Sequence, residues 1–271
     1  MREPVNLGYR IFRFRGAGEA PKFPVVLLRG LGRSSGFWLE FTEHLSAHFE
    51  VICLDLLGTG LSPSRWGRAN IADFSADVIH TLKELGCKRF HLVGISLGGM
   101  VAMEVAHRSK DVERLAVLAS SSRGGRGSRI RPDALLRLLW SLRKGTPSNR
   151  ELAPYLVARR TLQQRPNLPE VWDGVWKQEG FKTLPVLRQL LAAARFDARP
   201  ALQSLPCPAL FMVSRDDALV PWKNTVQLWE WTKGCRLVVL EGFGHDFPTE
   251  SPDEVIGHLS EFFLEQDGAH S

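Results

Sequence analysis

The segment Gly94-Ile95-Ser96-Leu97-Gly98-Gly99 joins the short apolar run 90–93 to the apolar helical stretch 100–107. An order of strand, sharp turn and helix exposes a serine hydroxyl at the end of a buried strand. Glycines flank the serine because side chains there would collide with the tightly turned backbone. Glycine is common enough for a chance match, so the position between strand and helix carries the argument. The alternative is a plain tight turn in which Ser96 caps the helix.

Apolar runs of the same kind recur along the chain on both sides of this turn. They are continuous rather than alternating, which is typical of strands buried on both faces. These runs occupy residues 23–28, 50–54, 90–93, 115–118, 209–213 and 237–240. Between them lie helical patterns, such as the spacing of Ile71, Phe74, Val78, Leu82 and Leu85. Alternation of strands and helices predicts an α/β fold, with a mostly parallel central sheet wrapped by helices.

The two ends of the chain add an edge strand and a terminal helix. Residues 9–14 predict a first strand or hairpin, and its alternating arginines indicate a sheet edge with one face in water. At the other end, Ser251-Pro252-Asp253-Glu254 predicts the start of a helix. We expect Ser251 to cap that helix and Glu254 to reach back in a capping box.

The alternation stops between residues 123 and 200, where no strand-like run occurs. Apolar residues there cluster at helical spacing in 135–142, 152–162 and 184–196. The glycine-rich stretch 123–127 and Pro200 bound the segment, and both suit hinges. We therefore expect an α/β core made of residues 1–122 and 201–271, and a helical, basic lid insertion made of residues 123–200.

Positive charge is concentrated in that expected lid. The chain carries 35 Lys and Arg against 29 Asp and Glu, a net charge of +6. Residues 123–200 hold 16 of these basic residues and 6 of the acidic ones, so the rest of the chain is slightly acidic. Such a basic segment is more often a solvated face than a binding site. The alternative is that it attracts an anionic substrate. No nucleic-acid recognition motif accompanies the charge, so nucleic acid is not an expected partner.

Length and composition exclude several other classes of protein. At 271 residues, with 44% hydrophobic and 24% charged residues, the chain predicts a folded domain rather than a disordered one. No apolar stretch approaches the roughly 18 residues of a membrane span. The start Met1-Arg2-Glu3-Pro4 does not resemble a secretory signal, so we expect a cytoplasmic protein. Four scattered cysteines predict reduced thiols without a metal site or disulfides.

A serine hydroxyl becomes a nucleophile only when a base removes its proton and a carboxylate orients that base. Two loops that follow expected strands supply candidates, namely Asp217 in 214–221 and His245 in 241–248. Loops at the carboxyl ends of parallel strands open onto one rim of the sheet, so Ser96, Asp217 and His245 can converge. Of the eight histidines, only His245 lies in a glycine-rich loop at that rim. The alternative for His245 is a loop histidine bonded to backbone.

Hydrolysis also needs backbone amides that stabilise negative charge on the carbonyl oxygen. Leu97 follows the serine, and Leu31 lies in the glycine-rich turn Leu28-Arg29-Gly30-Leu31-Gly32-Arg33. These two amides are the candidate oxyanion hole. The alternative for the second segment is a turn that merely leads into a helix near Trp38.

These pieces together resemble the α/β-hydrolase superfamily, in its lid-bearing, esterase- and lipase-like branch, over nearly the whole chain. The matching segments are Arg29-Gly30-Leu31-Gly32, Asp55-Leu56-Leu57-Gly58-Thr59-Gly60-Leu61-Ser62, 94–99, 217–221 and Gly244-His245-Asp246-Phe247-Pro248. The resemblance implies a serine hydrolase that cleaves a carboxylic ester or thioester of a small-molecule acyl substrate through an acyl-enzyme, without metal or organic cofactor. In the family pattern the acid stands four residues before a proline, which favours Asp217 over Asp216.

The chain departs from the family at Arg29, where a histidine is usual. An arginine there could brace the oxyanion loop or hold a substrate carboxylate. Trp38 and the lid residues Trp140, Trp172 and Trp176 are further candidates for substrate contact or loop support, since ligand pockets are largely apolar. Tryptophans in leucine-rich helices are nevertheless more often core.

The sequence leaves three functions open on the same fold. Ester or thioester hydrolysis is the first, and C–C bond hydrolysis or acyl transfer on the same three side chains is the second. The third is a ligand receptor without catalysis, because one fold hosts many functions. Substrate identity, acyl length and oligomeric state do not follow from the sequence.

Overall fold

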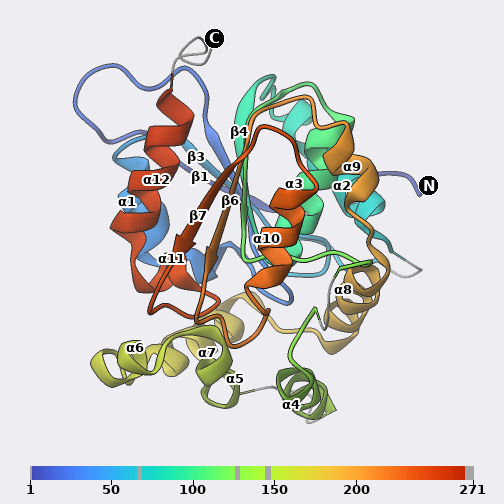
Figure 1. Cartoon of the computed structure of the whole chain (residues 1–271), viewed down its shortest axis with the longest axis vertical. Helices are drawn as coiled ribbons and strands as arrows, with labels where there is room; N and C mark the ends of the chain where they lie inside the picture. Colours follow the sequence, from blue (N-terminus) through green and yellow to red (C-terminus); the bar gives the residue numbers. More distant parts are fainter. Residues whose placement is uncertain (1, 66–68, 126–128, 144–147, 266–271) are drawn as a thin grey trace.

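The computed structural model describes residues 2–65, 69–125, 129–143 and 148–265, and a seven-stranded sheet forms its centre (Figure 1). The strand order is β1-β3-β2-β4-β5-β6-β7, and every neighbouring pair is parallel except β1 with β3. The strands are β1 (Tyr9–Phe12), β2 (Val25–Leu28), β3 (Val51–Leu54), β4 (Phe90–Ile95), β5 (Val112–Leu118), β6 (Ala209–Ser214) and β7 (Arg236–Leu240). The predicted α/β fold is therefore confirmed, and each expected run contributes a strand.

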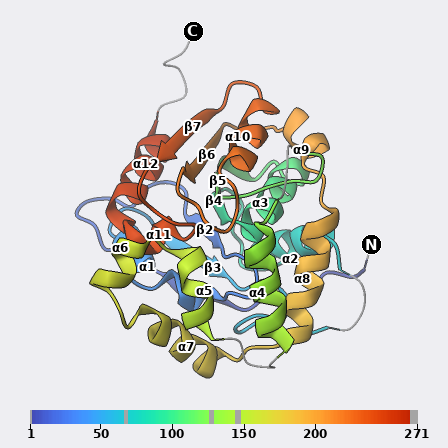
Figure 2. The ribbon, with the colours of Figure 1, turned by 60° about the horizontal axis from the view of Figure 1, so that its bottom comes forward.

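Helices cover both faces of the sheet, as Figures 1 and 2 show. One face carries α2 (Ile71–Glu84), α3 (Leu97–Arg108) and α10 (Lys223–Glu230), and the other carries α1 (Glu40–Ser46) and α12 (Pro252–Leu264). Successive side chains of a strand point to opposite faces, so one strand serves two cores. Within β2, Val26 and Leu28 pack on the α2 and α3 side, whereas Val25 and Leu27 pack on the α1 and α12 side. This is why the strand sequences are continuously apolar.

The edge strand and the terminal helix test two further expectations. β1 is a partly exposed edge strand, as predicted, with Tyr9 and Ile11 both exposed. The capping box expected at α12 is wrong. The Ser251 hydroxyl accepts no backbone N–H of the helix. It instead donates to the Glu254 carboxylate (3.1 Å), which therefore contacts the hydroxyl and not the cap backbone. The four cysteines are free thiols.

The chain between β5 and β6 contains helices and, among the described residues, no strand. These helices are α4 (Pro132–Arg143), α5 (Asn149–Leu156), α6 (Arg159–Gln164), α7 (Leu168–Glu179), α8 (Thr183–Arg195) and α9 (Arg199–Gln203). The helix expected over 152–162 is two helices that meet at residues 157–158, and α7 was not expected. We call residues 123–200 the insertion; its residues 126–128 and 144–147 lie outside the described part. Helices α4 to α7 cover the end of the sheet at the carboxyl ends of the parallel strands (Figure 2).

Candidate active site

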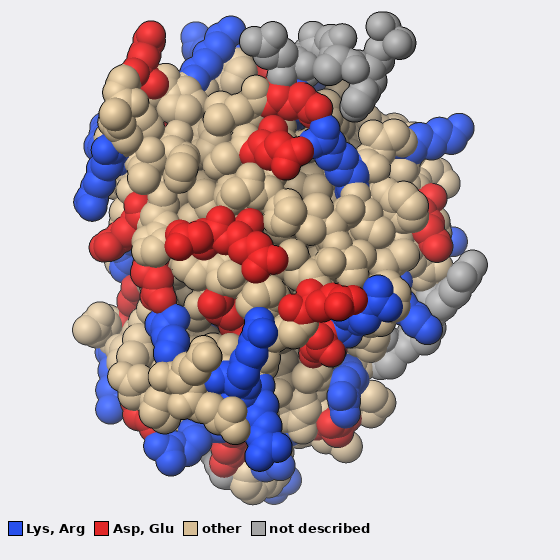
Figure 3. All heavy atoms as spheres, turned by 60° about the vertical axis from the view of Figure 1, so that its left-hand side comes forward, with Lys and Arg blue, Asp and Glu red and all other residues tan. Residues whose placement is uncertain are grey.

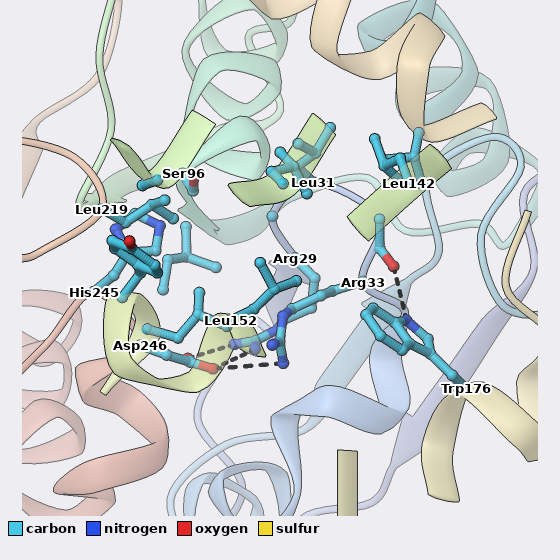
Figure 4. Close-up of a pocket in the computed structure, with 18 of the residues that line it drawn as sticks. Arg29, Leu31, Arg33, Ser96, Leu142, Leu152, Trp176, Leu219, His245 and Asp246 are labelled. Carbon is cyan, nitrogen blue, oxygen red and sulfur yellow. Dashed lines mark hydrogen bonds and ion pairs between the residues drawn. The ribbon is translucent and has the colours of Figure 1, made fainter. Parts of the chain in front are cut away.

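Ser96 lies on the sharp turn between β4 and α3. Its backbone has φ 58° and ψ −117°, a conformation that residues other than glycine rarely adopt. A Cβ atom at Gly94 would overlap the Gly98 carbonyl, and one at Gly98 would overlap the Leu28 carbonyl. Glycine is therefore required on both sides of the serine. This close packing directs Ser96 into a cavity at the end of the sheet (Figure 4).

His245 and Asp217 meet across the loops that follow β7 and β6. His245 Nδ1 lies 2.7 Å from Asp217 Oδ2, and their side chains are 5% and 0% exposed. The second oxygen, Asp217 Oδ1, accepts the amides of Leu219 and Val220, both at 2.8 Å. Each carboxylate oxygen thus has a partner, and Nδ1 of the imidazole faces the carboxylate. Since Nδ1 faces the carboxylate, Nε2 is the ring nitrogen that can exchange a proton with another group.

The neighbouring acid, Asp216, occupies a different place. Its Oδ2 accepts the Gly242 amide at 2.6 Å, a contact on the surface of the loop. Asp217 is the residue of this pair that reaches His245.

Ser96 and His245 line the same cavity, which has a volume of about 90 Å³. Figure 4 shows both side chains at one end of it, beside Leu219. Within the described residues no hydrogen bond joins Ser96 Oγ to the imidazole. Catalytic hydrogen bonds are often long in proteins without substrate and shorten in the complex. The three side chains that the sequence placed on one rim therefore do come together at that rim.

The glycine-rich turn after β2 lies against the serine. A Cβ at Gly30 would stand 3.2 Å from Ser96 Cβ, so the backbone approaches the serine closely there. The Gly30 carbonyl accepts the Arg33 amide at 3.2 Å, which closes the turn. The Leu31 amide has no hydrogen-bond partner among the described residues. Leu97 is the first residue of α3, where helix amides lack intrahelical partners. The two candidate amides thus come from segments that flank Ser96, the turn after β2 and the start of α3.

Arg29 is buried and points away from that turn, with 2% of its surface exposed. Its guanidinium donates to both carboxylate oxygens of Asp246, at 2.9 and 2.7 Å, and lies 4.6 Å from the ring centre of Trp38. Burial alone would raise the pKa of Asp246, but the charges of Arg29 and Arg33 hold it below its usual value. Arg29 therefore braces the loop of His245, since Asp246 directly follows His245, and not the oxyanion loop that the sequence analysis considered. Trp38 supports Arg29 and does not line the cavity.

Arg33 is a second buried arginine that the sequence analysis did not single out. Its guanidinium is stacked between the rings of Phe37 (4.4 Å) and Trp172 (4.3 Å) and donates to Asn149 Oδ1 at 3.3 Å. Burial lowers the pKa of Arg33 to about 9, although Asp246 opposes this shift. Phe37 belongs to the core, whereas Trp172 and Asn149 belong to the insertion. Arg33 therefore joins the two parts.

The three insertion tryptophans have three different environments. Trp176 lines the cavity, and Trp172 is fully buried against Arg33 outside it. Trp140 is 51% exposed and also lies outside the cavity. The helix α4 turns another face inward, because residues spaced by four share one side of a helix. That face is formed by Ala134, Leu138 and Leu142.

The loop that carries His245 is fastened to the insertion through Glu250. One carboxylate oxygen of Glu250 accepts the Gly244 amide (2.5 Å), and the other accepts the Ala158 amide (2.8 Å) and the Thr161 hydroxyl. Burial raises the pKa of Glu250, and these hydrogen bonds oppose the rise. The Asp246 amide also donates to the Leu156 carbonyl at 2.6 Å. No sequence motif indicated these contacts.

Some of the charged surface residues of the insertion pair with one another. Ion pairs join Arg150 to Glu170, Arg199 to Asp197 and Arg131 to Asp133. Figure 3 shows basic side chains gathered over the lower part of one face, the level at which the insertion lies in Figure 1, with acidic side chains above them.

Two further kinds of feature are absent from the described residues. They contain no cluster of three or more His, Cys, Asp or Glu side chains able to hold a metal ion. None of the helices in this part of the chain has the length and apolar character required to cross a bilayer.

Comparisons with known proteins agree with this architecture. The "Putative carbamate hydrolase RutD" of Agrobacterium fabrum is 29% identical over 94% of this chain and 98% of its own length. The protein of the same name from Pseudomonas savastanoi is 30% identical over 82% of this chain and 86% of its own. Among solved structures, the enol-lactonase of Burkholderia xenovorans superposes with a TM-score of 0.81 at 24% identity, over 96% of both chains. This last similarity concerns the fold alone.

The family comparison covers most of the chain. The sequence model described as "Alpha/beta hydrolase family" matches residues 25–258, which extend from the first residue of β2 into α12. That range includes the serine turn, both loops at the rim and the whole insertion. The chain is therefore a member of the alpha/beta hydrolase family.

Proposed function

We propose that this protein is a serine hydrolase that cleaves a carboxylic ester or thioester with an apolar acyl group. The observation that carries the proposal is the buried His245–Asp217 hydrogen bond of 2.7 Å, on a histidine that shares a cavity with Ser96. A nucleophile, a base and an orienting acid in this order are the requirements of acyl transfer through serine.

In the proposed reaction Ser96 Oγ attacks the acyl carbonyl carbon while His245 Nε2 takes the hydroxyl proton. The amides of Leu31 and Leu97 hold the oxygen that becomes negative. The C–O or C–S bond of the substrate then breaks, and the imidazolium gives its proton to the departing alcohol or thiol. Water repeats the attack on the acyl-enzyme with His245 again as base, which releases the acid and restores Ser96. Asp217 stays ionised and holds the imidazole in place throughout.

The lining of the cavity supports an apolar acyl group. Beyond Ser96 the walls come mainly from aliphatic and aromatic residues of α4, α5, α7 and α8 and of the loop before α8. They include Leu138, Leu142, Leu152, Trp176, Phe181 and Val186. The volume of about 90 Å³ is below the range of roughly 300–1,000 Å³ typical of ligand pockets, which favours short acyl chains. An attraction of anionic substrates by the basic insertion has less support, because many of its arginines are already paired.

Two alternatives use the same site. Acyl transfer or C–C bond hydrolysis requires another acceptor or another bond, and product analysis separates them from ester hydrolysis. A carbamate is also a carbonyl substrate, and the relatives from Agrobacterium and Pseudomonas carry that activity in their names. We disfavour a receptor without catalysis, because Ser96 and His245 share a cavity and His245 is paired with Asp217.

Labelling with a fluorophosphonate probe tests the proposal directly. We expect the wild-type protein to be labelled and Ser96→Ala to remain unlabelled, with an unchanged circular dichroism spectrum. A panel of p-nitrophenyl esters from acetate to decanoate should show a maximum of kcat/KM at a short chain. A folded wild-type protein that neither labels nor cleaves any ester of the panel would contradict the proposed function.

A further inference from the structure

The oxyanion loop, residues 30–32, receives no support from the residue that replaces the expected histidine. Arg29 gives both terminal nitrogens to Asp246, and its Nε atom is buried without a partner. Within the described residues, Arg29 therefore donates no hydrogen bond to the loop beside it. An oxyanion hole requires donors that are held in place before the reaction, so the loop needs another support.

Gln189, on α8 of the insertion, supplies a hydrogen bond at this place. Its side chain is 1% exposed, and its Oε1 accepts the Gly32 amide at 2.9 Å. Its Nε2 points to the Leu57 carbonyl at 3.4 Å. An N–H on one side and a carbonyl on the other fix which end of the amide is oxygen. The side chain thus bridges two core loops from the interior of the protein.

The helix α8 packs tightly against both loops around Gln189. A Cβ at Gly32 would lie 2.9 Å from Val186, and one at Gly58 would lie 2.5 Å from Pro185. Both glycines also have positive φ, 66° and 87°, so substitution there is strained as well as crowded. From α7, Trp176 Nε1 donates to the Gly32 carbonyl at 3.2 Å. Both backbone polar groups of Gly32 are therefore bonded to insertion side chains.

These bonds determine the orientation of the Leu31 backbone. The peptide unit before Leu31 is held by the Gly30 carbonyl, which accepts the Arg33 amide. The peptide unit after Leu31 contains the Gly32 amide, which Gln189 holds. We propose that Gln189 is a positioning residue of the oxyanion loop, so that the insertion fixes the Leu31 donor together with the core turn closed by Gly30 and Arg33. This proposal rests on the proposed function, because it concerns the same hydrolytic site.

The experiment compares Gln189→Leu with Gln178→Leu, the same substitution at an exposed position of α7. The measurements are kcat and KM for the preferred p-nitrophenyl ester and Ki for an alkyl trifluoromethyl ketone of matching length. The ketone adds to the serine and places an oxyanion in the hole. Since transition-state binding is what catalysis exploits, we expect Gln189→Leu to lower kcat by about 10- to 100-fold and to raise Ki by a similar factor. KM should change by less than about threefold, and Gln178→Leu should match the wild type.

Hydrogen exchange of the Gly32 and Arg33 amides, which are both hydrogen-bonded, provides a readout that does not need activity. Exchange should accelerate in Gln189→Leu and should remain slow in Gln178→Leu. If Gln189→Leu fails to fold, Trp176→Phe keeps an aromatic ring but removes the donor to the Gly32 carbonyl along with part of the cavity wall, and it should accelerate exchange of the Gly32 region and lower kcat by a smaller factor. If folded Gln189→Leu has the wild-type kcat, Ki and exchange rates, the inference about Gln189 is wrong while the proposed function still stands. Absence of fluorophosphonate labelling in the wild type would remove the proposed function and this inference together.

Discussion

The core and the insertion contribute to the candidate site in different ways. In the core, short local sequences place the reactive groups: glycines on both sides of Ser96 impose its backbone conformation, and the loops after β6 and β7 present Asp217 and His245. From the insertion, Gln189 holds the turn after β2, and Ala158 and Thr161 hold Glu250, the core residue that accepts the Gly244 amide of the His245 loop. On the proposed function, the core would supply the reactive groups, and the insertion would help to align them and form most of the cavity wall.

The largest effect should come from the core, at the nucleophile. Ser96→Ala should lower kcat for the preferred ester by about 10⁴- to 10⁶-fold, as removal of a catalytic serine does. The thermal midpoint should stay close to that of the wild type, because Ser96 is only partly buried. Stopped-flow or endpoint release of p-nitrophenolate measures the loss. Retention of more than about a tenth of the activity would remove Ser96 from the mechanism.

The two adjacent acids allow the next test of the core. Asp217→Asn should lower kcat by about 10⁴-fold, because an amide stabilises the wrong tautomer of the histidine. Asp216→Asn should change kcat by less than about threefold, since Asp216 contacts only the Gly242 amide on the loop surface. Steady-state kinetics of both variants decide which of the two acids orients His245. Equal losses in the two variants would contradict the assignment.

A third prediction concerns the stability of the core. Burial lowers the pKa of His91 to about 4, and its ring stacks on Phe263 at 4.4 Å. In the unfolded chain the His91 imidazole binds a proton near pH 6.5, whereas in the folded protein it does so only near pH 4. Protonation therefore favours the unfolded chain, and stability is lost as the pH falls from about 6.5 to about 4. The loss should approach about 3 kcal/mol, more than a hundredfold in the folding equilibrium. Urea unfolding from pH 7 to pH 4 should show a flatter pH dependence for His91→Phe, and an unchanged slope would contradict this cause.

The smallest effect should come from the clamp between the insertion and the His245 loop. Glu250→Ala removes the acceptor for the Gly244 and Ala158 amides, so it should lower kcat by about tenfold with little change in KM. Glu254→Ala is the matched control, because this exposed residue contacts Ser251 and not the loop. An effect on KM alone, or equal effects of the two substitutions, would show that the insertion only shapes the cavity.

The difference between the two regions also explains what the sequence could predict. The strands, the serine turn and the pair Asp217 and His245 are marked by local signals, namely continuous apolar runs and glycine-rich turns. Gln189 and Glu250 carry no such signal, because glutamine and glutamate are ordinary residues of an exposed helix. Most of their partners are distant in the chain: Gly32 and Gln189 are 157 residues apart, and Ala158 and Glu250 are 92 residues apart. Such contacts follow only from the packing of α8 and α6 on the core.

The same limit applies to the tryptophans and to Arg33. Apolar spacing indicated helices in the insertion but not which side of α4 faces inward, so Trp140 was named as a candidate where Leu138 in fact lines the cavity. Arg33 resembles a surface residue in the sequence, and only the rings on both sides of it make its burial possible. Burial of a charged side chain therefore has no signal in the sequence, because it depends on rings such as that of Trp172, which is distant in the chain.

The backbone contact between Gly244 and Val157 has a consequence for protein engineering. A Cβ at Gly244 would lie 2.6 Å from Val157 Cα, so the two main chains touch without an intervening side chain. Chimeras that exchange the whole insertion for that of a relative would have to reproduce the spacing at this point to within a few tenths of an ångström. Substrate range should therefore be altered more safely by changing individual wall residues such as Leu142 than by transplanting the segment.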